Sequence, residues 1–312
     1  MKAVTFGQPV ELGDQGALKP GRLLWLRSLL WLFGLAFLLV LAIGSLGEFA
    51  RRVVPASNLP LQFATQCAGA AIALGAYILA VRLVERRRAS ELAWRPALAE
   101  LAMGLLVGLL MFAAVMAILI GGGLYEITIN GANPAWRAGG AAIMSGVLEE
   151  LIVRGVILRL LWRGFGPVVA FVVSAALFGA GHLPNANSSL FAALCIAIEA
   201  GVMLGAFYAL TGRLWVSIGV HAAWNFTQGY VFGAAVSGTD FGASLATSTA
   251  IAGYPHWLTG GAFGPEASLP GLLVCSSVGF AALYAAWKAG RFAAPPAAEQ
   301  DATLAAPAVA EG

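Results

Sequence analysis

The chain has 312 residues, of which 60% are hydrophobic and 11% are charged, and its mean hydropathy is +0.83. This composition excludes an ordinary soluble domain, in which about a quarter of the residues are charged. The formal net charge of +3 is too small to indicate binding to nucleic acid. The composition instead predicts a polytopic membrane protein.

Long apolar segments alternate with short polar ones along the chain. Because a helix needs about 20 apolar residues to cross a bilayer, these segments predict an all-α bundle of about eight membrane-spanning helices. Gly104 and Gly108, one turn apart in the third segment, favour close packing against another helix. We expect the helices near residues 28–47, 62–84, 98–121, 140–162, 167–184, 190–210, 214–235 and 269–289.

The polar segments set the expected domain organisation and orientation. Residues 1–27 form a cytoplasmic N-terminal segment, 28–290 the membrane domain with a Gly/Ser/Thr-rich loop at 236–268, and 291–312 an Ala/Pro-rich tail typical of disordered chain. The distribution of Lys and Arg predicts that both termini are cytoplasmic. No cleavable signal precedes the first apolar segment, so we expect this segment to span the membrane. The low-complexity termini favour a bacterial protein, which we expect to be integral to the inner membrane.

Ionisable side chains are few within the predicted spans and therefore indicate function. Each costs about 2.5–3.5 kcal/mol to insert, so that it normally faces the bundle interior or a water-filled cavity. The candidates, together with one polar amide, are Glu149, Glu150, Arg154, His182, Glu199, His221 and Asn225.

The sequence GVLEELIVRG, residues 146–155, places two of these acids side by side. On a helix, Glu149 and Glu150 point about 100° apart and cannot share a face. Glu150 and Arg154 are four positions apart with the acid first, which is the favourable order for an ion pair. We therefore expect Glu150 to be the structural acid and Glu149 the reactive one. The alternative is that both acids serve helix packing.

Two other predicted helices carry histidines. FGAGH places Phe178 and His182 four positions apart, and HAAWN does the same for His221 and Asn225. With a rise of about 1.5 Å per residue, the depths of His182, His221 and Asn225 overlap with that of Glu149. We expect these four side chains to meet inside the bundle. The alternative for each histidine is a hydrogen-bonded core residue.

Such a cluster can hydrolyse an amide bond. A glutamate in an apolar cavity can act as a general base on water, with a histidine beside it on the path of the proton. His221 and Asn225 can donate hydrogen bonds to the oxyanion that forms. A competing hypothesis makes Glu149, His182 and His221 the ligands of a catalytic Zn²⁺. Because that hypothesis leaves Asn225 unexplained, the residues favour a reaction without a metal cofactor.

Three short motifs carry a resemblance to a known family. EELIVR (149–154) resembles EExxxR, FGAGH (178–182) resembles FxxxH, and HAAWN (221–225) resembles HxxxN. These are motifs of the CPBP or Abi family of intramembrane proteases, which includes the type II CAAX prenyl endopeptidases. The resemblance covers about residues 140–235, which makes 28–290 a protease domain with its core in that region.

The resemblance implies an eight-helix bundle around a conical cavity open to the cytoplasm. It also implies cleavage of a membrane-anchored or lipidated peptide within or beside the lipid bilayer, with no nucleic-acid partner. Family members are described both as metalloproteases and as glutamate-dependent enzymes. The functional residues it implies are Glu149 as the acid that activates water, His182 as its partner, His221 and Asn225 as oxyanion donors, and Arg154 acting through Glu150 to orient them.

Several further residues have open roles. Glu199 either lines the substrate cavity, as Phe178 would, or pairs with Arg159. Glu266 and His256 lie in the loop at 236–268 and are weaker candidates for a function.

Two other classes of function stay open. A non-catalytic scaffold or immunity protein could have the same fold, and it would tolerate the loss of Glu149. A proton-coupled transporter also places ionisable residues in the membrane, but it should show two related halves, and the sequence has no such internal symmetry.

Overall fold

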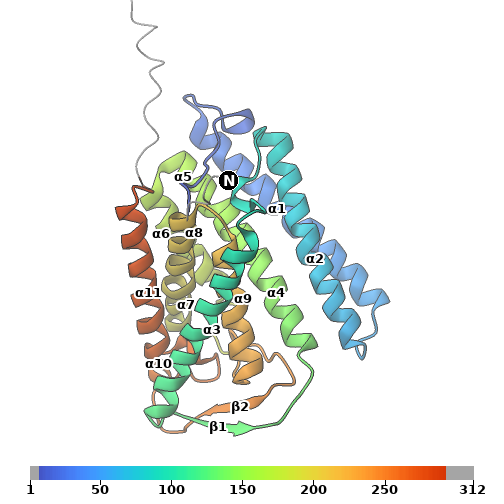
Figure 1. Cartoon of the computed structure of the whole chain (residues 1–312), viewed down its shortest axis with the longest axis vertical. Helices are drawn as coiled ribbons and strands as arrows, with labels where there is room; N and C mark the ends of the chain where they lie inside the picture. The colour runs from blue at the N-terminus through green and yellow to red at the C-terminus, as the bar shows by residue number, and fades with distance from the viewer. Residues whose placement is uncertain (1–6, 293–312) are drawn as a thin grey trace, which may run out of the picture.

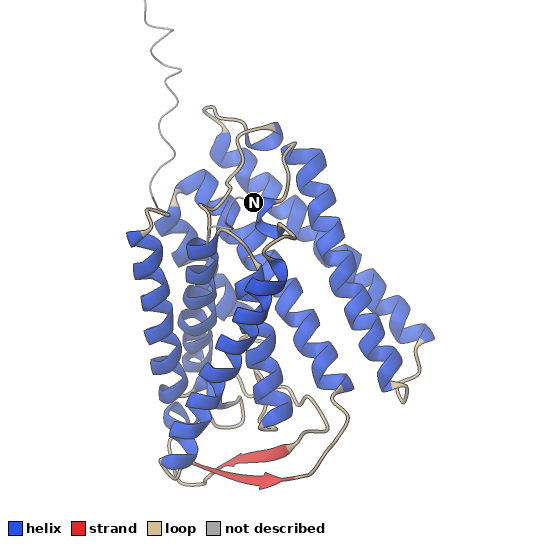
Figure 2. Cartoon of the chain, viewed as in Figure 1, coloured by secondary structure: helices blue, strands red, loops and turns tan. Residues whose placement is uncertain are grey.

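The structure, a computed structural model, describes residues 7–292, which form a bundle of long helices with one small sheet at one end (Figures 1 and 2). Nearly all of the tail expected at 291–312 lies outside the described residues. Four of the described helices contain π-helical turns (η2, η4, η5 and η6) without a break in the chain. The helices are α1 (Leu24–Val53), α2 (Leu59–Ala80), α3 (Ala97–Gly121), α4 (Trp136–Glu150) continuing through η4 (Leu151–Leu158) into α5 (Arg159–Phe165), α6 (Pro167–Gly181), α7 (Leu190–Ile196) continuing through η5 (Ala197–Val202) into α8 (Met203–Thr211), α9 (Trp215–Phe226) continuing into η6 (Thr227–Val231), and α11 (Leu269–Lys288).

Among residues 7–292, five helices are long and apolar enough to cross a membrane, judged by length and composition. They are α1, α2 with its continuation η2 (Val81–Glu85), α3, the α7–η5–α8 helix and α11. Phe33, Phe37 and Phe280 on α1 and α11 are exposed, as lipid-facing side chains are. The predicted all-α membrane fold is therefore confirmed, while the number of eight spans stays a prediction.

Polar caps and a glycine turn set where several helices begin. Asn58, Ser189 and Ser268 each accept a hydrogen bond from a backbone N–H in the first turn of α2, α7 and α11. Gly166, whose φ is 87°, adopts a conformation that side chains disfavour, and Pro167 begins the next helix directly after it. Short connections of this kind keep neighbouring helices in contact.

Glycines allow α9 to approach two neighbours closely. A Cβ atom on Gly104 or Gly108 of α3 would lie 2.4 Å or 2.3 Å from a backbone carbonyl oxygen of α9, which confirms the predicted close packing at these positions. On α4, a Cβ atom on Gly146 would lie 3.0 Å from the Cβ of Ala222. These contacts set His221, which precedes Ala222, beside α4.

A small antiparallel sheet closes the end of the bundle opposite the described N-terminal segment (Figures 1 and 2). Strand β1 (Tyr125–Ile129) pairs with β2 (Ala246–Ala250), and Tyr125 lies opposite Ala250. The loop at 236–268, expected to be irregular, also contains α10 (His256–Thr259) and the 3₁₀ turn η7 (Pro265–Ala267). The sequence did not predict regular structure in this loop, because β2 forms only by pairing with β1, a segment more than a hundred residues away.

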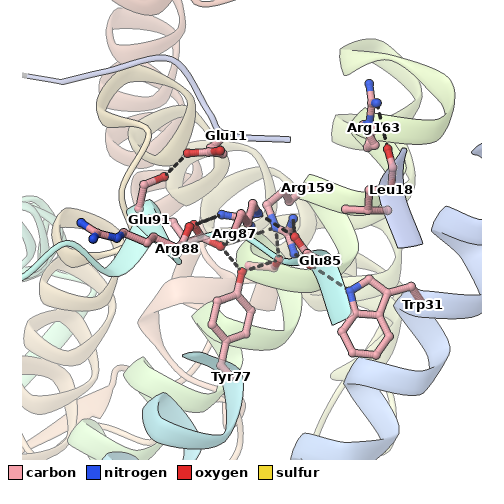
Figure 3. Close-up of polar contacts among 12 residues, drawn as sticks. Glu11, Leu18, Trp31, Tyr77, Glu85, Arg87, Arg88, Glu91, Arg159 and Arg163 are labelled. Carbon is pink, nitrogen blue, oxygen red and sulfur yellow. Dashed lines mark hydrogen bonds and ion pairs between the residues drawn. The ribbon is translucent and has the colours of Figure 1, made fainter. Parts of the chain in front are cut away.

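A buried network of charges lies near the described N-terminal segment, outside the predicted site (Figure 3). Glu85 binds Arg159 through two hydrogen bonds of 2.6 Å and 2.9 Å, and it accepts a third from the indole of Trp31. Arg87 bridges Glu85 and Glu91, at 2.7 Å and 2.8 Å. The network therefore ties together α1, the loop after η2 and α5.

This network also contacts the helix that carries the EELIVR motif. The hydroxyl of Tyr77 lies 2.5 Å from Glu91 Oε1 and 3.0 Å from the carbonyl oxygen of Gly155, and Arg159 Nε donates to the same carbonyl at 2.8 Å. Gly155 lies within η4, where the π-helical turn changes the usual hydrogen-bonding pattern. The predicted alternative in which Arg159 pairs with Glu199 is wrong, because Arg159 is held by Glu85 from a different helix.

Candidate active site

One cavity of about 180 Å³ lies between α4, α6, η5, α8, α9 and the loop that follows η6. All four predicted catalytic residues line it, together with Phe178 and two more acids. The polar and aromatic residues of its lining are Ser145, Glu149, Phe178, His182, Asn185, Glu199, Trp224, His221, Asn225, Ser237, Thr239, Phe241 and Glu266.

The cavity lies between the middle of the bundle and the end that carries β1 and β2. Ser237, Thr239 and Glu266, which help to line it, belong to the loop at that end. The described N-terminal segment lies at the opposite end (Figure 1). If the N-terminus is cytoplasmic, as predicted, the cavity lies toward the outer side of the membrane (Figure 1), and the loop at that end folds over it. The expected opening toward the cytoplasm stays a prediction.

Glu150 and Arg154 form the ion pair that their spacing predicts. Arg154 Nη1 lies 2.7 Å from Glu150 Oε1, and both side chains are fully buried. The other end of the guanidinium donates to the carbonyl oxygens of Ala200 and Gly201 in η5. Its carbon atom lies 5.0 Å from the centre of the Phe178 ring. Arg154 thus joins the helix with the two glutamates to the helix with Glu199.

His221 lies between the two glutamates. Its Nδ1 is 2.9 Å from Glu150 Oε1, and its Nε2 is 3.8 Å from Glu149 Oε2. Because the Glu150 carboxylate also binds Arg154, it accepts from two sides and fixes the orientation of the imidazole. The sequence paired Glu150 only with Arg154 and missed this contact, which depends on the packing of α4 against α9.

Glu149 is the more accessible of the two acids. About a third of its side chain (35%) is exposed, whereas that of Glu150 is fully buried. This difference follows from their neighbouring positions on the helix, which direct one carboxylate into the cavity and the other into the protein. The accessible carboxylate is the one that can contact water and substrate.

Asn225 and His182 complete the lining, and Asn225 contacts a neighbouring helix whereas His182 contacts its own. Asn225 Nδ2 donates to Ser145 Oγ at 3.0 Å, which makes Ser145 a partner that the sequence did not indicate. His182 Nδ1 lies 2.8 Å from the carbonyl oxygen of Phe178. Since a carbonyl only accepts, Nδ1 carries the proton and Nε2 is left as an acceptor. Within residues 7–292, no hydrogen bond or ion pair joins His182 to Glu149.

Three π-helical turns surround the cavity. They directly follow the two glutamates (η4), contain Glu199 (η5) and follow Asn225 (η6). A π-helical turn shifts the hydrogen bonds of the backbone and is frequent at functional sites. Here the carbonyl oxygen of Ala200 within η5 accepts from Arg154. No pattern in the sequence indicated these turns.

The predicted zinc ligands do not form a metal site in this geometry. Glu149 and His221 are 3.8 Å apart, and the free Nε2 of His182 is chemically able to bind a metal, but within residues 7–292 no hydrogen bond or ion pair joins His182 to either of them. In the described part of the chain, no three His, Cys, Asp or Glu side chains are grouped so that they could hold a metal ion. The residues present therefore do not fit a zinc centre, and the mechanism proposed below has no step through a metal.

The other candidate residues differ in whether they line the cavity. Glu199 and Glu266 line the cavity and are almost completely buried, at 3% and 2% exposure. His256 begins α10 and is exposed outside the cavity. Glu266 was the weaker of the acidic candidates, because a loop position in the sequence does not show that the loop folds back over the helices.

The fold and the cavity define the class of the protein: an all-α membrane protein with a buried polar site between its helices. In a comparison with family models, residues 131–227 match the model described as Rce1-like, type II CAAX prenyl endopeptidase Rce1-like. The matched region contains the EELIVR, FGAGH and HAAWN motifs, so the match confirms the resemblance that these motifs carry. Searches of curated proteins and of solved structures found no match.

Proposed function

We propose that the protein is an intramembrane endopeptidase that hydrolyses a peptide bond of a membrane-anchored or lipidated substrate. The observation that carries this proposal is the placement of Glu149 and His221, whose Oε2 and Nε2 atoms lie 3.8 Å apart in one cavity. The match of residues 131–227 to a family of CAAX prenyl endopeptidases supports it.

In the proposed reaction, Glu149 takes a proton from a water molecule as its oxygen attacks the carbonyl carbon of the substrate. The free Nε2 of His182 accepts a hydrogen bond from the same water and so helps to position it. The proton held by Glu149 then passes to the leaving amine as the C–N bond breaks. The products are a carboxylate and an amine, so that one water molecule is consumed.

The oxyanion is stabilised from the opposite wall. Asn225 Nδ2, which donates to Ser145 in the empty cavity, turns toward the substrate oxygen. A protonated His221 donates through Nδ1 to Glu150 and through Nε2 into the cavity. Donors fixed in this way stabilise charge that develops only in the transition state. Glu150 and Arg154 are positioning residues in this mechanism.

The proposed setting is a bacterial inner membrane, with both termini in the cytoplasm. The distribution of Lys and Arg supports this orientation. The lipid bilayer would then present the substrate segment to the cavity from the side, and the three residues that follow a prenylated cysteine are one candidate substrate of this family.

The test uses the purified protein in proteoliposomes with farnesylated and palmitoylated peptides. Glu149→Gln keeps the shape of the side chain but removes the base, and we expect turnover to fall by about 10²–10⁴-fold. Glu126→Gln, an exposed position on β1, is the control and should retain activity. A non-catalytic scaffold would show no turnover with the wild-type protein. Equal rates for wild type and Glu149→Gln would overturn the assignment of the base.

A further inference from the structure

The cavity holds two acids that the proposed reaction does not use. Glu199 comes from the π-helical turn η5, and Glu266 comes from η7, just before α11. A Cβ atom placed on Gly271 would lie 3.2 Å from Glu199 Oε1 and 3.0 Å from the backbone oxygen of Glu266. The two residues therefore flank the same point at the start of α11.

Each of these acids has one oxygen without a hydrogen-bond partner in the described part of the chain. The oxygens are Glu199 Oε1 and Glu266 Oε2. Gln228 Oε1, near Glu266, is a third buried acceptor without a partner, since the amide nitrogen of Gln228 donates to the carbonyl of Ala235. Buried acceptors are normally hydrogen-bonded, because leaving one unsatisfied costs its full desolvation free energy. Glu199 and Glu266 both line the cavity, so each has an acceptor that a donor group of a bound ligand can satisfy.

Both acids are held firmly in position. Arg154 donates to the carbonyl oxygens of Ala200 and Gly201, the two residues that follow Glu199. The backbone N–H of Ser237 donates to Glu266 Oε1. The first contact links Glu199 to the helix of Glu149, and the second links Glu266 to the loop over the cavity. The pair is thus fixed relative to the reacting residues.

Within residues 7–292, no Lys or Arg residue lines the cavity near these carboxyl groups. Arg154 is engaged by Glu150 and by backbone carbonyls, and the ion-pair contacts of His221 are with Glu149 and Glu150. Burial raises the pKa of the Glu266 carboxyl to about 8, and its hydrogen bonds to the backbone lower the pKa only in part. A cationic group that enters the cavity would supply both the missing donors and the missing charge.

We propose that Glu199 and Glu266 form a subsite for the ammonium or guanidinium group of a Lys or Arg side chain of the substrate. This inference rests on the proposed function, since the subsite shares its cavity with Glu149 and His221. The subsite selects peptides with a basic residue near the scissile bond. A neutral side chain of equal length leaves the acceptors of the subsite unsatisfied and binds more weakly.

The test measures binding, so that it does not depend on turnover. Lipidated hexapeptides carry Lys at each internal position in turn, and a second set carries norleucine at the same positions. Their affinities are measured in proteoliposomes with Glu149→Gln, which cannot cleave them under the proposed function. We expect one position at which Lys binds about tenfold more tightly than norleucine, the size of one charge-assisted hydrogen bond. Adding Glu199→Gln and Glu266→Gln should abolish this preference.

Asp240→Asn is the matched control, since it removes one exposed charge from the same loop without touching the cavity lining. It should leave the preference for Lys unchanged. The inference is overturned if no position prefers Lys, or if the preference survives the double substitution in properly folded protein, as judged by its melting temperature. A preference for Lys together with full activity of Glu149→Gln would instead overturn the proposed catalytic base alone.

Discussion

The carboxylate of Glu150 lies 2.9 Å from Nδ1 of His221, on a helix that is 71 residues away in sequence. The same oxygen atom binds Arg154 at 2.7 Å. A single buried oxygen thus connects the ion pair within the EELIVR motif to the imidazole of the HAAWN motif. Any change at Glu150 should therefore affect both the stability of the bundle and the orientation of His221.

We expect Glu150→Ala to destabilise the protein by about 3–5 kcal/mol, because it leaves Arg154 buried without its partner. Glu150→Gln keeps an acceptor for His221 and should cost less. Both variants should lower kcat more than they raise KM, since His221 loses its fixed orientation. Melting temperatures in detergent and steady-state kinetics measure the two effects. Retention of wild-type stability by Glu150→Ala would contradict the buried ion pair.

Asn225 and Ser145 give a second, separable prediction. If Asn225 donates to the oxyanion, Asn225→Ala should lower kcat by about 10²–10³-fold with little change in KM. Ser145→Ala removes only the hydroxyl to which Asn225 donates in the empty cavity. That variant should lower kcat far less. Equal losses for the two variants would show that their mutual hydrogen bond, rather than contact of Asn225 with substrate, is what matters.

Glu266 predicts how stability depends on pH. Burial raises the pKa of its carboxyl from 4.5 to about 8 in the folded protein. The folded state therefore binds more protons than the unfolded state between these values, and the free energy of unfolding falls as the pH rises from about 4.5 to 8. Glu266→Gln cannot lose a proton, and it should remove this part of the slope. Melting temperatures of both proteins from pH 5 to pH 9 test the prediction, and parallel curves would contradict it.

The sequence predicts those features that depend on local spacing. Apolar segments of sufficient length give the helices, and the spacing of Glu150 and Arg154 gives their ion pair. The spacing of Gly104 and Gly108 likewise indicates a helix contact, although it does not identify α9 as the partner. Each of these features follows from residues within a single helix.

Features that depend on the packing of distant segments could not be predicted. Glu85 and Arg159 form their ion pair across 74 positions, and no local pattern distinguishes this pairing from one with Glu199. The shared contact of Glu150 with His221 requires the close approach of α4 and α9. The fold of the loop over the cavity, which brings in Glu266, depends on the pairing of β1 with β2 and on contacts with the helices.

The close approach of α3 to α9 yields a final prediction about the site. Gly108→Ala would place a Cβ atom 2.3 Å from the carbonyl oxygen of Val220, so that α9 must move. We expect a loss of about 1–3 kcal/mol in stability from overpacking, even though alanine favours a helix more than glycine does. Because Val220 directly precedes His221, kcat should fall as well. Gly75→Ala on α2 is the matched control, since nothing lies within 4 Å of the added methyl group. It should be neutral or slightly stabilising, and an equal loss at both positions would contradict the contact between α3 and α9.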